Sequence, residues 1–173
     1  MTDLISRADA FAARAHASID QRRKYTGDPY IGHPRRVAQT VKDTGARDEV
    51  IAAALLHDVV EDTPVTLEEI RTEFGKDVAA LVEMVTDVSR PADGNRRVRK
   101  AMDRDHLALA SAEGQTIKLA DLIDNTASIT RYDPGFAKIY MREAVELPGV
   151  LKKGDRTLRQ RASILAKQYG SKR

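Results

Sequence analysis

Four side chains capable of acid–base chemistry or metal binding follow an apolar run in the middle of the chain. Residues 52–56 are alanine and leucine, which favour helix, and they are followed by His57, Asp58, Glu61 and Asp62. Polar groups placed beside buried apolar ones are unfavourable unless they are paired or bound to a metal ion. The pattern therefore predicts a functional site at the end of a buried helix.

A metal centre is the chemistry that these residue types favour. Neighbouring residues on a helix point about 100° apart, so His57 and Asp58 can share one ion only if other ligands complete its shell. His33 and Asp121, from two other predicted helices, have suitable side chains. Two histidines and two aspartates make a mixed nitrogen and oxygen shell, which suits manganese, iron or zinc. Such an ion can polarise a phosphoryl oxygen.

Glu61 and Asp62 follow His57 and Asp58 by four residues. If the helix continues, both carboxylates lie one turn beyond the predicted ion and on the same side. There they could orient a water molecule and take its proton. The alternative is a solvated acidic helix end, which is electrostatically poor because a helix C-terminus is already negative. We therefore favour the functional interpretation.

The rest of the chain supplies the helices that must position these residues. Apolar spacing predicts helices over about 3–20, 34–44, 48–60, 76–88, 96–113, 116–125, 136–147 and 156–169. Asp48 is a candidate N-cap, and Thr66 and Glu69 form a capping-box pattern that begins a short helix ending at 74–75. No segment alternates as a strand does. We expect an all-α fold of about eight or nine helices, in a single domain over residues 1–173.

Composition excludes several classes of protein. The 173 residues are enough for one domain with a substantial core. Cysteine is absent, which excludes disulfides, thiolate nucleophiles and cysteine-based metal sites. A net charge of +3 is small for a nucleic-acid-binding protein, and no apolar run approaches the ~18 residues of a membrane span. We expect a cytoplasmic protein that binds neither nucleic acid nor membrane.

A basic cluster, Arg22-Arg23-Lys24, precedes a Gly-Asp-Pro turn at 27–29. One interpretation is a solvated helix end whose cations lie near the negative pole of the helix dipole. The other is a turn that presents cations to an anionic ligand. His16, close to this cluster, is expected to be a packing residue or to support the site.

Three segments together resemble one protein family. They are Tyr30-Ile31-Gly32-His33-Pro34, the stretch 54–63 (Ala-Leu-Leu-His-Asp-Val-Val-Glu-Asp-Thr) and Lys118-Leu119-Ala120-Asp121. They look like the HD-domain phosphohydrolases and, more narrowly, the hydrolase domain of RelA/SpoT homologues and the small alarmone hydrolases. The His-Asp pair alone occurs in a superfamily with many substrates. Val-Val-Glu-Asp-Thr after it, with His-Pro upstream, is more specific to the alarmone-hydrolase branch.

The resemblance implies manganese-dependent hydrolysis of the 3′-diphosphate of ppGpp or pppGpp, which yields GDP or GTP and pyrophosphate. The metal ligands implied by the matching positions are His33, His57, Asp58 and Asp121. The pair implied to position and activate the attacking water is Glu61 and Asp62. The residues implied to bind the nucleotide are Arg23, Lys24, Asn125 and Tyr140.

Some questions stay open after this resemblance. The chain could be a phosphatase or pyrophosphohydrolase for another nucleotide, such as NADPH, or a nucleotide-binding sensor without turnover. The intact acidic pair argues against the sensor, because a pure binder needs no water-activating group. Leu122, Ile123 and Asp124 depart from the family pattern beside the nucleotide pocket, where they bear on base or phosphate selectivity. The cations at 96–100 either add to the rim of that pocket or form a solvated face.

Overall fold

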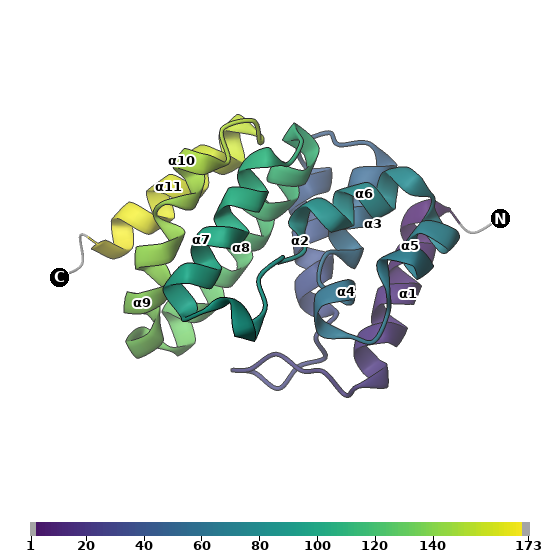
Figure 1. Cartoon of the computed structure of the whole chain (residues 1–173), viewed down its shortest axis with the longest axis horizontal. Helices are drawn as coiled ribbons and strands as arrows, with labels where there is room; N and C mark the ends of the chain where they lie inside the picture. Colours follow the sequence, from purple (N-terminus) through teal and green to yellow (C-terminus); the bar gives the residue numbers. More distant parts are fainter. Residues whose placement is uncertain (1–2, 171–173) are drawn as a thin grey trace. The chain divides into compact units, whose positions relative to one another are not determined.

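The computed structural model describes residues 3–170 and contains helices but no strand in that range (Figure 1). Nine of the helices have eight or more residues, and two are single turns of four residues. The all-α prediction is therefore confirmed. No helix of the described chain is both long enough and apolar enough to span a bilayer. The chain divides between Thr86 and Asp87 into two compact units, each with its own set of packed helices.

The first unit is built around one apolar helix. Its helices are α1 (Leu4–Ser18), α2 (Gly32–Lys42), α3 (Asp48–Leu56), α4 (Val59–Asp62), α5 (Leu67–Phe74) and α6 (Lys76–Val85). Helix α3 packs against α1, α2 and α6, and every residue from Val50 to Leu56 is buried. A helix that is apolar on all sides is stable only when neighbours cover all of its faces. The alanines of α3 also allow these neighbours to approach closely.

The second unit is built around a long helix. It contains η1 (Pro91–Asp93), α7 (Arg96–Leu109), α8 (Ala112–Tyr132), α9 (Pro134–Ala144), α10 (Leu147–Val150) and α11 (Arg156–Gly170). Helix α8 packs against α7, α9 and α11 (Figure 1). The loop before α11 approaches α8 so closely that Gly154 N–H donates to the buried Gln115 Oε1 at 3.2 Å. A Cβ at Gly154 would lie 2.7 Å from Leu119 Cδ1, so only glycine fits there without displacement.

Several helix boundaries differ from those expected from the sequence. Helix α3 ends at Leu56, and residues 57–58 form a turn before α4 begins, so the expected continuous helix to residue 60 is wrong. The N-cap of α3 is the extended residue Arg47, and Asp48 is already helical. Helix α7 ends at Leu109 and not at residue 113, and α8 runs from 112 to 132 and not from 116 to 125. Ser111 caps the start of α8 by accepting from Gly114 N–H at 3.1 Å. The capping box of Thr66 and Glu69 is confirmed.

Candidate functional site

Two histidines and one aspartate converge in the first unit. His33 lies in the first turn of α2, and His57 and Asp58 lie in the turn between α3 and α4. One ligand atom of each residue lies within 4.8 Å of the other two. Asp58 Oδ2 is 3.1 Å from His57 Nε2 and 3.5 Å from His33 Nε2. Both imidazoles are buried, and three nitrogen and oxygen donors around one point are consistent with part of the shell of a divalent ion.

The break between α3 and α4 orients His57. Its Nδ1 lies 2.8 Å from the carbonyl oxygen of Ala54, one of the last carbonyls of α3. A carbonyl can only accept, so Nδ1 carries the proton and the Nε2 lone pair faces Asp58. Metal-binding histidines are commonly oriented in this way by a carbonyl bonded to the other ring nitrogen. The same bond satisfies a carbonyl at the helix end, which gives a physical reason for α3 ending there.

Tyr30 links the two sides of this cluster. Its hydroxyl donates to Asp58 Oδ2 at 2.7 Å, and its carbonyl oxygen accepts from His33 N–H at 2.9 Å. Its ring also packs against His33, with 5.7 Å between ring centroids. Sequence reasoning quoted Tyr30 within a motif but gave it no role in the site. The only signal for it was its position three residues before His33.

The acidic pair lies at the end of α4, a helix of four residues. Asp62 N–H donates to the Asp58 carbonyl at 2.9 Å, which ties the short helix to the turn at residues 57–58. Asp62 Oδ2 accepts from Gln21 Nε2 at 2.8 Å. The Asp62 side chain still reaches solvent, but loss of hydration raises the pKa of its carboxyl, and the Gln21 bond opposes this rise. Gln21 was also missed from the sequence.

The Arg23–Lys24 cluster lies in a turn and not at a helix end, because α1 stops at Ser18. Arg23 N–H donates to Asp28 O at 2.8 Å across this turn. The Arg23 guanidinium lies 5.7 Å from the ring centroid of Tyr30, the residue that binds Asp58. Lys24 Nζ lies 5.1 Å from the ring centroid of Tyr25. The structure therefore places Arg23 beside a residue that contacts the histidine–aspartate cluster.

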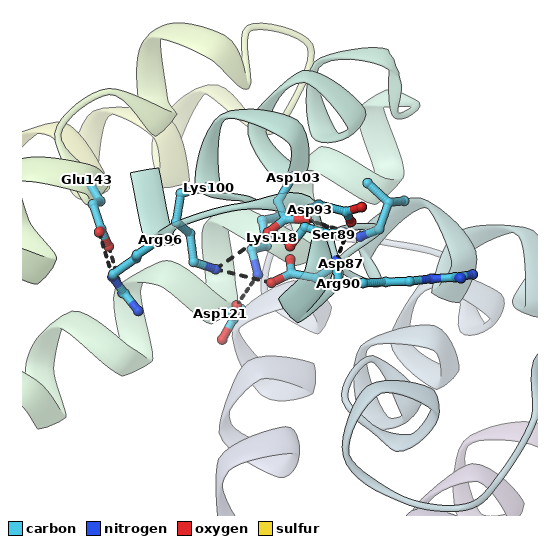
Figure 2. A network of polar contacts seen from close by, with 11 residues as sticks. Asp87, Ser89, Arg90, Asp93, Arg96, Lys100, Asp103, Lys118, Asp121 and Glu143 are labelled. Atoms are coloured by element: carbon cyan, nitrogen blue, oxygen red, sulfur yellow. Dashed lines mark hydrogen bonds and ion pairs between the residues drawn. The ribbon is translucent and has the colours of Figure 1, made fainter. Parts of the chain in front are cut away.

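Three predicted site residues lie together in the second unit. Asp121, buried on α8, has Lys118 Nζ 2.9 Å from its Oδ2 and Asn125 Nδ2 donating to its Oδ1 at 2.6 Å. Figure 2 shows Lys118 pointing toward Asp121. Burial raises the pKa of the Tyr140 hydroxyl, and the negative charge of Asp121 raises it further. Each oxygen of the Asp121 carboxylate thus contacts another side chain of α8, Lys118 at Oδ2 and Asn125 at Oδ1.

A cavity of about 610 Å³ opens in the second unit next to Lys118. Its acidic lining residues are Asp87, Asp103, Glu143 and Glu146. Its basic lining residues are Arg96, Arg97, Lys100, Arg104, Lys118 and Arg142.

Most of these cations are paired. Arg96 makes two bonds of 2.8 Å to Glu143, and Lys100 Nζ lies 3.1 Å from Asp87 Oδ2 (Figure 2). Arg97 and Arg142 make no ion pair with any residue in the range 3–170, so their charge is available to an anionic ligand.

Comparison with known proteins gives one consistent result. The family model described as HD domain matches residues 8–138. The guanosine-3′,5′-bis(diphosphate) 3′-pyrophosphohydrolase MESH1 of Homo sapiens is 38% identical in a match that covers 96% of this chain and 94% of that protein. A solved structure of a metazoan ortholog of SpoT, described as hydrolysing ppGpp, superposes with a TM-score of 0.86 at 29% identity. It covers 98% of this chain and 97% of the solved one.

Longer relatives match over a part of their length. The probable guanosine-3′,5′-bis(diphosphate) 3′-pyrophosphohydrolase of Synechocystis sp. is 37% identical over 153 residues. That match covers 83% of this chain but only 19% of the relative. The chain spans a similar share, 20%, of the corresponding enzyme of Aquifex aeolicus.

Proposed function

Because the chain belongs to the HD-domain family, we propose that it is a metal-dependent hydrolase of ppGpp and pppGpp. It would remove the 3′-diphosphate as pyrophosphate and leave GDP or GTP. The observation that carries the proposal is the convergence of His33, His57 and Asp58 directly before the acidic pair Glu61 and Asp62. The names of the relatives support the choice of substrate.

The metal is proposed to be Mn²⁺, held by His33, His57 and Asp58 with Asp121 as the fourth ligand. The first three fit such an ion because their donor atoms converge and the tautomer of His57 turns the Nε2 lone pair toward Asp58. Asp121 is proposed as a ligand because it ends the Lys-Leu-Ala-Asp segment that resembles the family pattern. When bound, the ion would polarise phosphoryl oxygens and lower the pKa of water. Mixed nitrogen and oxygen ligands without thiolate suit Mn²⁺.

Glu61 and Asp62 are proposed to orient the attacking water and accept its proton. Water adds to the phosphorus attached to the ribose 3′ oxygen, the bond between that oxygen and phosphorus breaks, and the oxygen takes a proton to become a hydroxyl. A carboxylate whose pKa is raised holds a proton better than an ordinary aspartate, which suits Asp62 to this transfer.

Several cations are proposed to bind the substrate. The substrate carries four or five phosphates, and an acidic site without cations would repel it. Arg23 and Lys24 would make charge-assisted hydrogen bonds to phosphate, and an arginine guanidinium can also stack on a purine. Arg97 and Arg142 would add to this binding, and Asn125 and Tyr140 would line the nucleotide pocket. We also propose that both units make one catalytic domain, since the family match at 8–138 runs across the division at Thr86.

The test is a nucleotide panel of ppGpp, pppGpp and NADPH, assayed with Mn²⁺ and followed by product identification. We expect pyrophosphate from ppGpp. Orthophosphate alone, or no turnover, would refute the proposal, and turnover of NADPH without ppGpp would support the alternative nucleotide.

Two variants test the assigned roles. Glu61→Gln combined with Asp62→Asn should abolish turnover and leave the metal bound. Loss of metal from this double variant would mean that their role is misassigned. Asp58→Ala should lose both metal and activity, so an active Asp58→Ala protein would contradict the proposed shell.

A further inference from the structure

A buried histidine is connected to the acidic pair through one glutamine in the first unit. His16, at the end of α1, has its Nδ1 2.7 Å from Gln21 Oε1. Gln21 Nε2 donates to Asp62 Oδ2 at 2.8 Å. The His16 ring is only 1% exposed, and it packs against Tyr30 with 4.8 Å between ring centroids. The function proposed above assigns no role to His16 or Gln21.

The chemistry of the three side chains fixes which atom donates and which accepts in each of the two hydrogen bonds. An ionised carboxylate only accepts hydrogen bonds, so the NH₂ end of Gln21 must face Asp62. The carbonyl end of Gln21 then faces His16, which must carry its proton on Nδ1. Burial lowers the pKa of His16, so the ring is neutral and has a single N–H to donate. A rotated Gln21 amide would turn its carbonyl oxygen toward the carboxylate and lose both bonds.

Gln21 is itself fixed at its backbone. Its N–H donates to the His16 carbonyl at 3.0 Å, and its carbonyl accepts from Tyr30 N–H at 3.1 Å. Asp62, in contrast, lies at the end of a helix of only four residues, which is too short to be stable by itself. A residue fixed at its backbone is therefore bonded to a carboxylate at the end of a single helical turn.

We propose that Gln21 and His16 are positioning residues, which hold the Asp62 carboxylate in the orientation that receives the proton of the attacking water. Gln21 contacts the carboxylate, and His16 acts through Gln21 by fixing its amide. This proposal rests on the proposed function, because it needs Asp62 to act on water.

If His16 served only to fill space, its position would not need a ring with polar nitrogen atoms. Its Nε2 is buried and has no hydrogen-bond partner among residues 3–170, so an apolar side chain would fill the space without that penalty. The bond from Nδ1 to Gln21 is what an imidazole adds at this position. Asparagine can place an N–H close to the position of Nδ1, whereas leucine fills similar space with no donor.

The test compares four variants of the full chain. Gln21→Met and His16→Leu should lower kcat for ppGpp about tenfold, a typical effect of losing a residue that orients a site. Their KM and bound Mn²⁺ should not change. His16→Asn should keep most of kcat. Gln39→Met is the matched control, because Gln39 Nε2 donates to Asp43 Oδ1 at 2.7 Å on the surface of α2.

Unchanged kcat in Gln21→Met would overturn the proposal, and so would a loss of metal that explains the lower rate. Equal losses of kcat in His16→Asn and His16→Leu would also overturn it, because they would show that an N–H donor to Gln21 does not support the rate.

A second readout separates this proposal from the proposed function. In NMR spectra, the Gln21 side-chain amide should give two resolved, slowly exchanging signals in the wild type and in His16→Asn. These signals should move to the position of solvated amides in His16→Leu. If no nucleotide is turned over, the proposed function fails and the positioning role fails with it. Solvated-amide signals in the wild type would instead refute the connection itself, whatever the substrate.

Discussion

Tyr30→Phe removes one hydroxyl and leaves the ring in place, so it tests how the proposed metal ligands are held. The hydroxyl donates to Asp58 Oδ2 at 2.7 Å, and both histidine Nε2 atoms face this same oxygen. The bond therefore orients Asp58 toward the point where the three donors meet. The ring contact with His33, at 5.7 Å between centroids, should survive the substitution.

The expected effect follows from the strength of this bond. A hydrogen bond to a charged group contributes about 1.5–3 kcal/mol. Tyr30 and Asp58 are both partly exposed, so water can replace part of the lost bond and the lower end applies. About 1.4 kcal/mol corresponds to a tenfold change in a dissociation constant. We therefore expect Mn²⁺ to bind about tenfold more weakly to Tyr30→Phe, at the lower end of the usual effect of such supporting residues.

The assay is competition between the protein and a chromophoric chelator for Mn²⁺, at one pH and salt concentration. Tyr25→Phe is the control, because it removes a hydroxyl from the same connection between α1 and α2, on a ring that packs against Lys24. Equal Mn²⁺ affinity in the wild type and Tyr30→Phe would refute the reasoning. A large fall in melting temperature would show that the hydroxyl serves folding instead.

Three further predictions concern stability, substrate binding and pH. Gly154→Ala should destabilise the protein by about 1–3 kcal/mol in urea unfolding, because the new Cβ has no room. Gly149→Ala, where no atom lies within 4 Å, should have a much smaller effect. Arg97→Ala and Arg142→Ala should each raise KM for ppGpp about fivefold with kcat unchanged, since exposed charges contribute on the order of 1 kcal/mol. A change in kcat alone would contradict a binding role. Because the pKa of Asp62 is raised, its carboxylate takes a proton at a higher pH than an ordinary aspartate. Activity should therefore fall on acidification before the ordinary aspartate range is reached, and kcat measured against pH with metal content monitored checks this.

Local patterns in the sequence were sufficient for the fold class and for part of the site. Helical spacing of apolar residues predicted the all-α chain, since that spacing reports which face of each helix is buried. The capping box of Thr66 and Glu69 was readable because both partners lie within one helical turn. His57 and Asp58 stood out because polar residues follow an apolar run that needs burial on every side. The structure places His33 beside them, and its role as a metal ligand stays a prediction.

Contacts between distant residues were decided only by the tertiary structure. The bonds from Tyr30 to Asp58 and from Gln21 to Asp62 join residues 28 and 41 positions apart, and no local pattern reports such pairs. The end of α3 was also not predicted, although the bond between the His57 ring and the Ala54 carbonyl that accompanies it spans only three residues. Sequence alone thus determined which residue types could do the chemistry. Folding determined which neighbours orient them, because orientation comes from hydrogen bonds whose partners meet only in the packed unit.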